Sequence, residues 1–400
     1  MPQHRYGDGQ NSTSGPNTIQ HYYDRAGIKA ANRVNVFQQF ADRRSMPQRY
    51  GRTFKTSKWQ HMYDRSQSDP DFATKGYLSA RSVDDVSASL LNAQLAEGAG
   101  AVNKRTLTKV TVSTEFHRYG EMLDYTDEVD LFSEDMMQTR YREELGALAN
   151  SRNEDLIMMD MLATGTVLYA GPAVSMATVG TGIAADGTED STYRVSYDLI
   201  RRGVRLLVRN RARKNTQIIT GDVKVDTRTV ARSFYAIIGA DVKSDLENLT
   251  RGKDHSTEYV YVPAHKYGAA GNLAEGEVGA MHEVRFIEAE GIVSYVGEGA
   301  VPPQNYVGDL SISGATDLTS TDEADRGNFN VFPILFPTEG SFATVGLKGK
   351  DKIKFHSKPP SDVSNTNPYG TSGFFSYNFF YAGLITREER LLKILVNASE

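Results

Sequence analysis

The sequence predicts an α+β protein organised around one unusually long helix. The first observation is the spacing of apolar residues over 133–163, which recur every three or four positions. The second is a set of short alternating or apolar runs, bounded by glycine, proline and asparagine, that are typical of strands. The third is the absence of cysteine, which excludes disulfides, a thiolate nucleophile and cysteine-ligated metal sites.

The composition is that of an ordinary folded protein. Hydrophobic residues make up 39% of the chain and charged residues 24%. The net charge of −5 argues against a surface built wholly for nucleic acid. No apolar run reaches the ~20 residues that a membrane span needs, and the polar start is unlike a signal peptide. We therefore expect no membrane partner and a chain that stays where it is made.

Residues 1–46 are predicted to form a basic N-terminal arm. The first sixteen residues have the composition of a mobile tail, and the apolar spacing from Ile19 to about Arg44 indicates a helix. Residues 1–60 carry ten Lys or Arg and three Asp, a local charge of +7. This asymmetry suggests an acidic partner, either a protein surface or a phosphate backbone, and a solvated helix face is the alternative.

A long extended loop is predicted next, over 47–116. Arg52–Trp59 and Lys104–Thr114 alternate like strands, and the residues between them lack a convincing core pattern. Strand edges on such a loop are a liability in an isolated chain. A second subunit would supply the missing partner.

The long helix is expected over Ser133–Ala163, roughly 45 Å of rod. Asp130 or Ser133 would cap its start, and Gly165 fits a C-terminal cap. Its predicted buried seam contains Met137, Tyr141, Leu145, Leu148, Leu156, Met159 and Ala163. Such one-sided helices are commonly core helices or coiled-coil arms, so the seam alone does not indicate a function.

A second amphipathic helix is predicted after the glycine-rich segment 171–190, which we interpret as a domain boundary. Ser196 would cap it, with Leu199, Ile200, Val204 and Leu207 facing inward and Arg201, Arg202, Arg205 and Arg209 facing outward. Seven of the fourteen residues 201–214 are basic. The outer face would pair with carboxylates on neighbours or contact nucleic acid.

The rest of the chain alternates strands and short helices. Strands are expected at 217–220, 234–238, 260–262, 283–288, 331–336 and 343–347, and a helix at 241–249. Residues 302–330 are predicted to be a polar surface insertion. The last two apolar runs, 374–385 and 391–396, are predicted to close the chain as a buried hairpin.

No catalytic or cofactor motif is present. The eight histidines fall in no zinc-binding spacing, no phosphate-binding glycine loop occurs, and there is no nucleophile elbow. We therefore predict no enzyme activity, no cofactor and no metal. An enzyme with a dispersed site has no positive feature in its favour.

Several stretches of the chain resemble the major capsid proteins of tailed phages, which share the HK-ninety-seven-type fold, and more specifically those of N-four-like short-tailed phages. The resembling stretches are Tyr22-Tyr23 with the helix after it, Met46-Pro47 with Gly51, Tyr119–Asp130, Tyr197–Asn210, Gly276–Ile287 and Asn367–Gly373. The likeness covers most of residues 18–396.

The resemblance implies four parts of the chain. These are an N-terminal arm (1–46), an extended loop (47–116), a peripheral domain (117–189 and 346–400) with a spine helix at about 133–163, and an axial domain (190–345) with an insertion at about 302–330.

What the resemblance implies for function is a shell protein of the virion, assembled in the bacterial cytoplasm. Copies would form hexamers and pentamers around non-specifically held double-stranded DNA, with portal and decoration or scaffolding proteins as further partners. The alternatives are a nanocompartment shell of the same fold and a nucleic-acid-binding module.

Two sets of basic residues are candidate contacts. Those between subunits are Arg49, Arg52, Lys55, Lys58, Lys104, Arg105, Arg140 and Arg152. Those facing DNA in the interior are Arg25, Arg33, Arg43, Arg44, Arg201, Arg205 and Arg209.

Overall fold

The fold is seen in a computed structural model, which describes most of the chain. The described residues are 35–59, 82–95, 97, 109–132, 137–188, 190–217, 229–251, 256–259, 261–264, 276–350, 352–362 and 367–400. By packing, the described chain divides into two units. The smaller holds residues 122–145 and 356–376, and the larger holds 33–121, 146–355 and 377–400.

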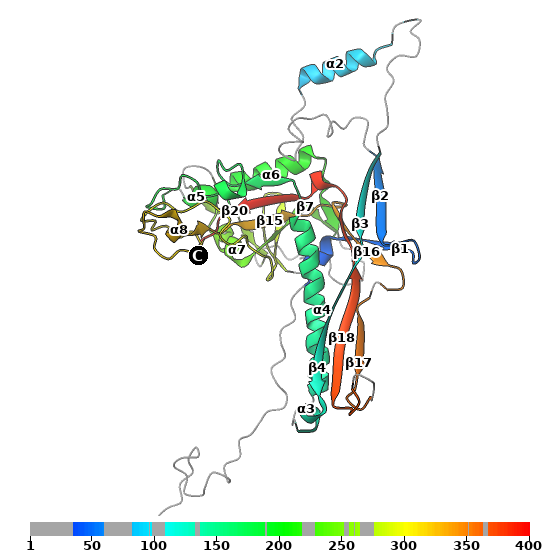
Figure 1. The fold of residues 1–400 in the computed structure, drawn as a ribbon. Coiled ribbons are helices and arrows are strands. Elements are labelled where there is room, and N and C mark those ends of the chain that lie inside the picture. Colours follow the sequence, from blue (N-terminus) through cyan, green and yellow to red (C-terminus); the bar gives the residue numbers. More distant parts are fainter. Residues whose placement is uncertain are drawn as a thin grey trace, which may run out of the picture. The chain divides into compact units, whose positions relative to one another are not determined.

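The core of the larger unit is one mixed sheet (Figure 1), with strand order β10-β11-β12-β7-β15-β20-β5 and β6 paired with β7. Its strands are β5 (Val167–Tyr169), β6 (Asn215–Gln217), β7 (Thr229–Ile238), β10 (Val262–Pro263), β11 (Glu277–Met281), β12 (Val284–Glu288), β15 (Phe332–Phe336) and β20 (Leu392–Val396). Every residue of β15 and β20 is buried, in keeping with sequences that are apolar except for Lys393.

Helix α6 (Tyr197–Arg209) packs on this sheet as the sequence predicts. The Ser196 hydroxyl accepts a hydrogen bond from the Leu199 amide, and all four predicted inward residues are buried. A Cβ at Gly203 would lie 2.9 Å from the Ile394 side chain, so this glycine lets the helix approach β20 closely. The predicted helix at 241–249 is also confirmed, as α7 (Ala240–Glu247).

The long helix α4 spans Met137–Leu162, and Ser133 lies outside the described residues. The predicted seam is partly wrong. Leu145 is buried, but Leu148 and Met159 are exposed, and the buried set continues through Ala149, Glu154, Ile157, Met158, Met161 and Leu162. Because residues 156–162 are apolar almost all round, their spacing fits more than one face. Gly165, predicted as a C-terminal cap, does not have the positive φ that glycine commonly adopts there.

The chain enters the described part at a short 3₁₀ turn, η2 (Phe37–Phe40), followed by strand β1 (Asp42–Met46). The helix predicted from Ile19 to Arg44 is therefore wrong beyond residue 36, and residues 19–34 lie outside the described residues. Strand β1 pairs in parallel with β16 (Phe342–Leu347), which also pairs with β19 (Gly383–Ile385). A partner 301 residues away in the pairing overrides the local periodicity.

The predicted pair of loop strands is confirmed as the antiparallel β2 (Thr53–Trp59) and β3 (Lys109–Glu115). A helix that the sequence analysis did not predict, α2 (Val83–Ala93), lies between them in the chain. Figure 1 shows the hairpin and α2 in blue and cyan.

A three-stranded sheet runs in the order β17 (Lys354–Lys358), β18 (Ser372–Tyr381), β4 (His117–Thr126), and α3 (Asp127–Phe132) follows β4. In the smaller unit, the rings of Tyr125 and Phe375 stack at 5.3 Å, and Asn367 closes the turn before β18 by accepting from the Thr371 amide. The predicted terminal hairpin is wrong, because β20 pairs with β15 and β5 rather than with β18 or β19.

The polar insertion at 302–330 contains only short elements, as predicted: β13 (Ile312–Ser313), α8 (Glu323–Arg326) and β14 (Asn328–Phe329). The Tyr306 hydroxyl donates a hydrogen bond to the buried Asp190 carboxylate at 2.8 Å. This buried hydrogen bond connects the insertion to α5 (Asp190–Tyr193). The remaining short elements are η3 (Met176–Thr178), β8 (Thr250–Arg251), β9 (Ser256–Tyr259) and η5 (Glu388–Arg390). None of the helices within the described ranges is both long and apolar enough to span a bilayer.

Candidate functional site

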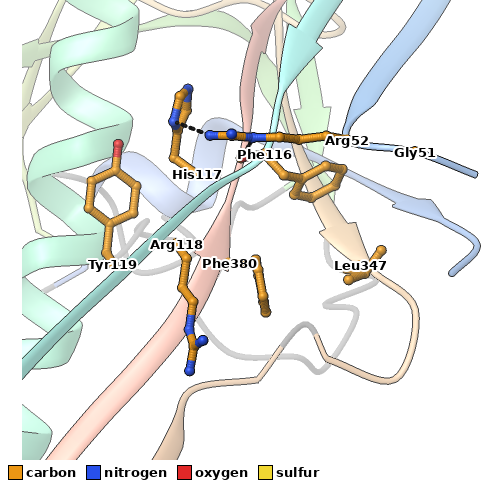
Figure 2. A pocket seen from close by; sticks show the side chains of 8 residues that line it. All are labelled: Gly51, Arg52, Phe116, His117, Arg118, Tyr119, Leu347 and Phe380. Atoms are coloured by element: carbon orange, nitrogen blue, oxygen red, sulfur yellow. Dashed lines mark hydrogen bonds between the residues drawn. The ribbon is translucent and has the colours of Figure 1, made fainter. Parts of the chain in front are cut away.

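The base of the β2–β3 hairpin forms a hollow of about 630 Å³ (Figure 2). It is lined by Gly51, Arg52, Phe116, His117, Arg118, Tyr119, Leu347 and Phe380. These residues come from the two ends of the hairpin, the start of β4, β16 and β18. The hollow therefore lies where the extended loop joins the body of the larger unit.

Arg52 fixes the base of the hairpin through three hydrogen bonds. Its Nε donates to the Phe116 carbonyl at 2.7 Å, and its Nη2 donates to His117 Nδ1 at 3.1 Å, the bond drawn in Figure 2. The Phe116 amide donates to the Arg52 carbonyl at 3.1 Å. Because a guanidinium can only donate, His117 accepts at Nδ1 and is the neutral Nε2–H tautomer in this arrangement.

Beneath these polar contacts lies a small apolar cluster. Buried Phe116 packs with Met46, Val345 and Ala382, and partly buried Phe54, Leu347 and Phe380 surround them. The Arg118 guanidinium lies 5.8 Å from the centre of the Phe380 ring, within range of a cation–π contact. The cluster joins β1, β2, β16 and β18, so the hairpin is anchored firmly at one end.

The C-terminal half of α4 carries a second polar group. The Tyr381 hydroxyl donates to Asp160 Oδ2 at 2.7 Å. Burial raises the pKa of Asp160, and the hydrogen bond from Tyr381 acts in the opposite direction. Burial and the Asp160 charge raise the pKa of Tyr381, so this pair stays a neutral phenol beside a carboxyl group.

Helix α4 also anchors the point where the N-terminal segment enters the fold. The buried Glu154 carboxylate accepts from the amides of Phe37 (2.8 Å) and Gln38 (3.2 Å), at the start of η2. The side chains of Asn35 and Asn150 exchange two hydrogen bonds, at 2.8 and 2.9 Å. A carboxylate facing two amide donors is a strong, charge-assisted contact.

The end of α4 is held by residues from the last strands. The buried Lys393 ammonium donates to the Leu162 carbonyl at 2.8 Å and to the Tyr295 hydroxyl at 3.3 Å. Burial lowers the pKa of Lys393. Thr164 donates to the Leu391 carbonyl, and Glu388 accepts from the Gly165 amide at 2.9 Å. A cation at a helix C-terminus is electrostatically favourable, and here it replaces the predicted glycine cap.

The outer face of α6 borders another hollow, of about 590 Å³. Its lining residues are Asp198, Arg201, Arg202, Val204, Arg205, Val208, Arg209 and His282. Arg201 lies 4.0 Å from Asp198 and 5.4 Å from the Tyr197 ring. Within the described ranges, Arg202, Arg205 and Arg209 have no ion pair or hydrogen bond through their guanidinium groups. This surface is therefore an uncompensated row of cations beside exposed Val208.

Some of the predicted inter-subunit contacts are engaged within the chain. Lys58 pairs with Glu389 at 3.3 Å, Arg152 pairs with Glu121 at 3.1 Å, and Arg52 is bound as described above. Lys55 is exposed on β2, and Arg49 is exposed with φ of 72° in the turn before it. Arg140 lies on α4, and Lys104 and Arg105 lie outside the described residues. A role between subunits stays a prediction for all of them.

The predicted DNA-facing residues separate into two places. Arg43 and Arg44 lie on β1, where Arg44 donates to the Thr56 hydroxyl at 3.2 Å. Arg201, Arg205 and Arg209 share the outer face of α6. Arg25 and Arg33 lie outside the described residues. Their contact with DNA stays a prediction.

The sequence did not predict four side chains that bind the basic and backbone groups described above. They are Glu121, Glu154, His117 and Glu389. Their partners lie between 31 and 331 residues away, so no local spacing could have identified them. Among the residues that the structure describes, no three His, Asp or Glu side chains converge as a metal site. The geometry is that of anchoring and contact surfaces rather than of a reaction centre.

Comparison with known proteins places this geometry in context. No protein-family model matches the chain. The chain is 28% identical over 398 residues to the major capsid protein of Pseudomonas phage KPP21, covering 95% of this chain and 93% of that protein. The similarity therefore extends over nearly the full length of both.

Solved structures show the same architecture at low sequence identity. The capsid of Ralstonia phage GP4 matches with a TM-score of 0.56 and 9% identity, covering 98% of each chain. The mature capsid of bacteriophage PhiM1 matches with a TM-score of 0.53 and 11% identity, over 98% of this chain and 95% of that one. The capsid of Helicobacter pylori bacteriophage KHP30 gives 0.52 and 11%, over 99% and 100%. The predicted fold is confirmed: the chain has the HK-ninety-seven-type fold of tailed-phage major capsid proteins.

Proposed function

We propose that this chain, a major capsid protein of a tailed phage, builds the icosahedral head as hexamers and pentamers through its extended loop and spine helix. The observation that carries the proposal is the full-length similarity to a phage major capsid protein, together with the capsid fold. The chain is a structural component of the virion capsid and not an enzyme. Many copies of it form a homo-oligomeric shell.

The shape of the extended loop supports a role between copies. The β2–β3 hairpin is fixed at its base by Arg52 and the Phe116 cluster, while Trp59 at the far end of β2 is exposed. Large apolar side chains on such an arm gain free energy by being covered. A neighbouring copy in a closed shell covers them and satisfies the strand edges.

The finer assignments belong to the same proposal. We place the chain in the N-four-like short-tailed lineage on the stretches quoted above, with Tyr197–Asn210 the longest of them. Portal and decoration or scaffolding proteins complete the head, and double-stranded DNA is held non-specifically. The basic N-terminal segment that ends at Arg43 and Arg44 contacts either DNA or an adjacent copy.

The register of the hairpin allows a sharp test. Trp59 lies directly opposite Lys109, so residues 60–108 can be replaced by an Asn-Gly turn without disturbing β2 or β3. We expect the shortened subunit to fold, by circular dichroism and thermal unfolding, but to form no closed shells. The native chain should form hollow particles by sedimentation velocity and negative-stain electron microscopy.

The outcomes separate the alternatives. Normal shells from the shortened chain would contradict the role of the loop. A native chain that stays a monomer under all conditions, including with partner proteins from its own source, would contradict the shell itself. Nucleic acid inside native particles distinguishes a phage head from a nanocompartment.

A further inference from the structure

Helix α2 presents several apolar side chains to solvent. Leu90 is 61% exposed, Leu91 66%, Leu95 70% and Val83 84%. Val83, Leu90 and Leu91 recur at helical spacing within α2 and therefore share one face, and Leu95 follows two residues after the helix ends. Burying a leucine contributes about 1.5–3 kcal/mol, so this face is suited to docking on a partner.

The charge of α2 limits what that partner can be. Residues 82–97 contain Asp84, Asp85 and Glu97 and no basic residue, a net charge of −3. Two of the three acids lie in the first turn of the helix. A nucleic acid or another acidic surface would repel this segment, whereas a basic surface with an apolar centre would attract it.

The outer face of α6 has these properties. Val208 is 54% exposed in its centre, and Arg201, Arg202, Arg205 and Arg209 lie around it in the hollow of about 590 Å³. Among the described residues, Asp198 is the single carboxylate that lines this hollow. Three of the four guanidinium groups have no acidic partner in the part of the chain that the structure describes.

The spacing along the two helices also matches. Asp84 and Leu91 are seven residues apart, and so are Arg201 and Val208, which places both pairs on one helix face. If the helices lie parallel with Leu91 against Val208, then Asp84 lies opposite Arg201, because each is seven residues before the facing apolar residue. One alignment therefore pairs apolar with apolar and acid with base.

We propose that α2 of one copy docks in parallel on the outer face of α6 of a second copy. The inference rests on the proposed shell function and names the surface that receives the extended loop. It also assigns the α6 arginines to a protein contact rather than to DNA. The apolar centre of the surface and the Asp198 carboxylate favour a helix over a phosphate backbone.

Cross-linking tests the contact directly because the chain has no cysteine. The variant Leu91→Cys with Val208→Cys is assembled, mildly oxidised and examined on a non-reducing gel. We expect a ladder of covalent oligomers that a reducing agent collapses to monomer. The matched control joins Leu91→Cys with Val293→Cys, an exposed valine elsewhere on the larger unit, and should give at least tenfold less cross-linked product.

Every outcome bears on the proposal. Assembled particles that yield only monomer bands overturn the docking while leaving the shell intact. A fast-migrating internally cross-linked monomer overturns it in favour of docking within one chain. Absence of particles from the native chain is instead a failure of the proposed function. The orientation is tested by Asp84→Cys with Arg201→Cys, which cross-links only if the helices are parallel.

A charge exchange separates a protein contact from a DNA contact. In the cysteine-pair background, Arg201→Glu should lower the cross-linked yield several-fold, and Asp84→Arg added to it should restore the yield. Arg213→Glu, outside the hollow, is the control and should leave the yield unchanged. Loss of packaged DNA with an unchanged yield would overturn the proposal in favour of nucleic acid.

Discussion

Helices α6 and α2 are both amphipathic, but among the described residues the apolar face of α6 is covered and that of α2 is not. The 13 residues of α6 place Leu199, Ile200 and Leu207 against the central sheet, where they are buried. The 11 residues of α2 leave Leu90 and Leu91 exposed. The difference teaches that one sequence pattern serves two purposes here. In α6 the apolar face stabilises the folded subunit, whereas in α2 the apolar face is free to contact a neighbouring copy.

The largest effect is expected from making the same substitution in each helix. Leu207→Ala removes a fully buried side chain and should lower the free energy of unfolding by about 2–5 kcal/mol. Leu91→Ala removes an exposed one and should change it by no more than ~0.5 kcal/mol, yet reduce assembly. Urea unfolding of dissociated subunits measures the first quantity, and sedimentation of assembled material measures the second. Equal costs in the two helices would contradict the comparison.

This contrast also explains what the sequence could predict. Helix α6 was predicted correctly, cap included, because Ser196 precedes a one-sided apolar pattern whose partner is the adjacent core. Helix α2 was not predicted, and its apolar residues join none of the core clusters that the described residues form. The β2–β3 pair was predicted because alternation and turn-rich flanks are local signals.

Long-range pairing accounts for most of the errors. The start of strand β1 was expected to be helical, but β16, 301 residues later in the pairing, provides its hydrogen bonds. Strand β20 was expected to pair with the strand before it, but its partners are β15 and β5. The predicted seam of α4 was partly wrong for a different reason, since Leu156–Leu162 is apolar on several faces and only the tertiary contacts select one. Contacts between copies could not be tested within one chain, so the role of the basic residues predicted to lie between subunits stays a prediction.

A second prediction concerns Glu154 on α4, which holds the N-terminal segment where that segment enters the fold. Glu154→Ala leaves the amides of Phe37 and Gln38 without their buried acceptor and should lower the free energy of unfolding by about 3 kcal/mol. Glu144→Ala, an exposed site on the same helix, is the control and should have little effect. An equally small cost at Glu154 would show that the entry of the N-terminal segment does not depend on this carboxylate.

A third prediction uses the pH dependence of the same helix. Burial raises the pKa of Asp160 above its ordinary value of 3.8, so the folded state binds this proton more tightly than the unfolded state. Its favourable contribution is fully present below that value and is lost as the pH rises through the raised pKa. Asp160→Asn is neutral at every pH and can still accept from Tyr381. The gain in stability of this variant over the native chain should therefore grow as the pH rises from about 4 through the raised pKa of Asp160.

Urea unfolding across this pH range measures that difference. Exposed Asp124→Asn on β4 is the control, and its difference from the native chain should stay flat. A flat difference for Asp160→Asn as well would mean that the burial of Asp160 does not perturb its titration.

The smallest change in the stability of the subunit is expected at Arg152. An effect of this residue on assembly is therefore the easiest to separate from an effect on folding. Its ion pair with Glu121 leaves the two side chains 54% and 40% exposed, so solvent screens it and Arg152→Ala should cost no more than ~1 kcal/mol. If Arg152 also contacts a neighbouring copy, as predicted, the same variant should assemble markedly less well. Arg118→Ala, which removes a cation beside Phe380 at the hairpin base, is the comparison variant for unfolding and for particle yield. An Arg152 variant with native stability and native particle yield would restrict the role of this arginine to its pair with Glu121. It would also leave the extended loop, rather than the spine helix, as the region that depends on a neighbour.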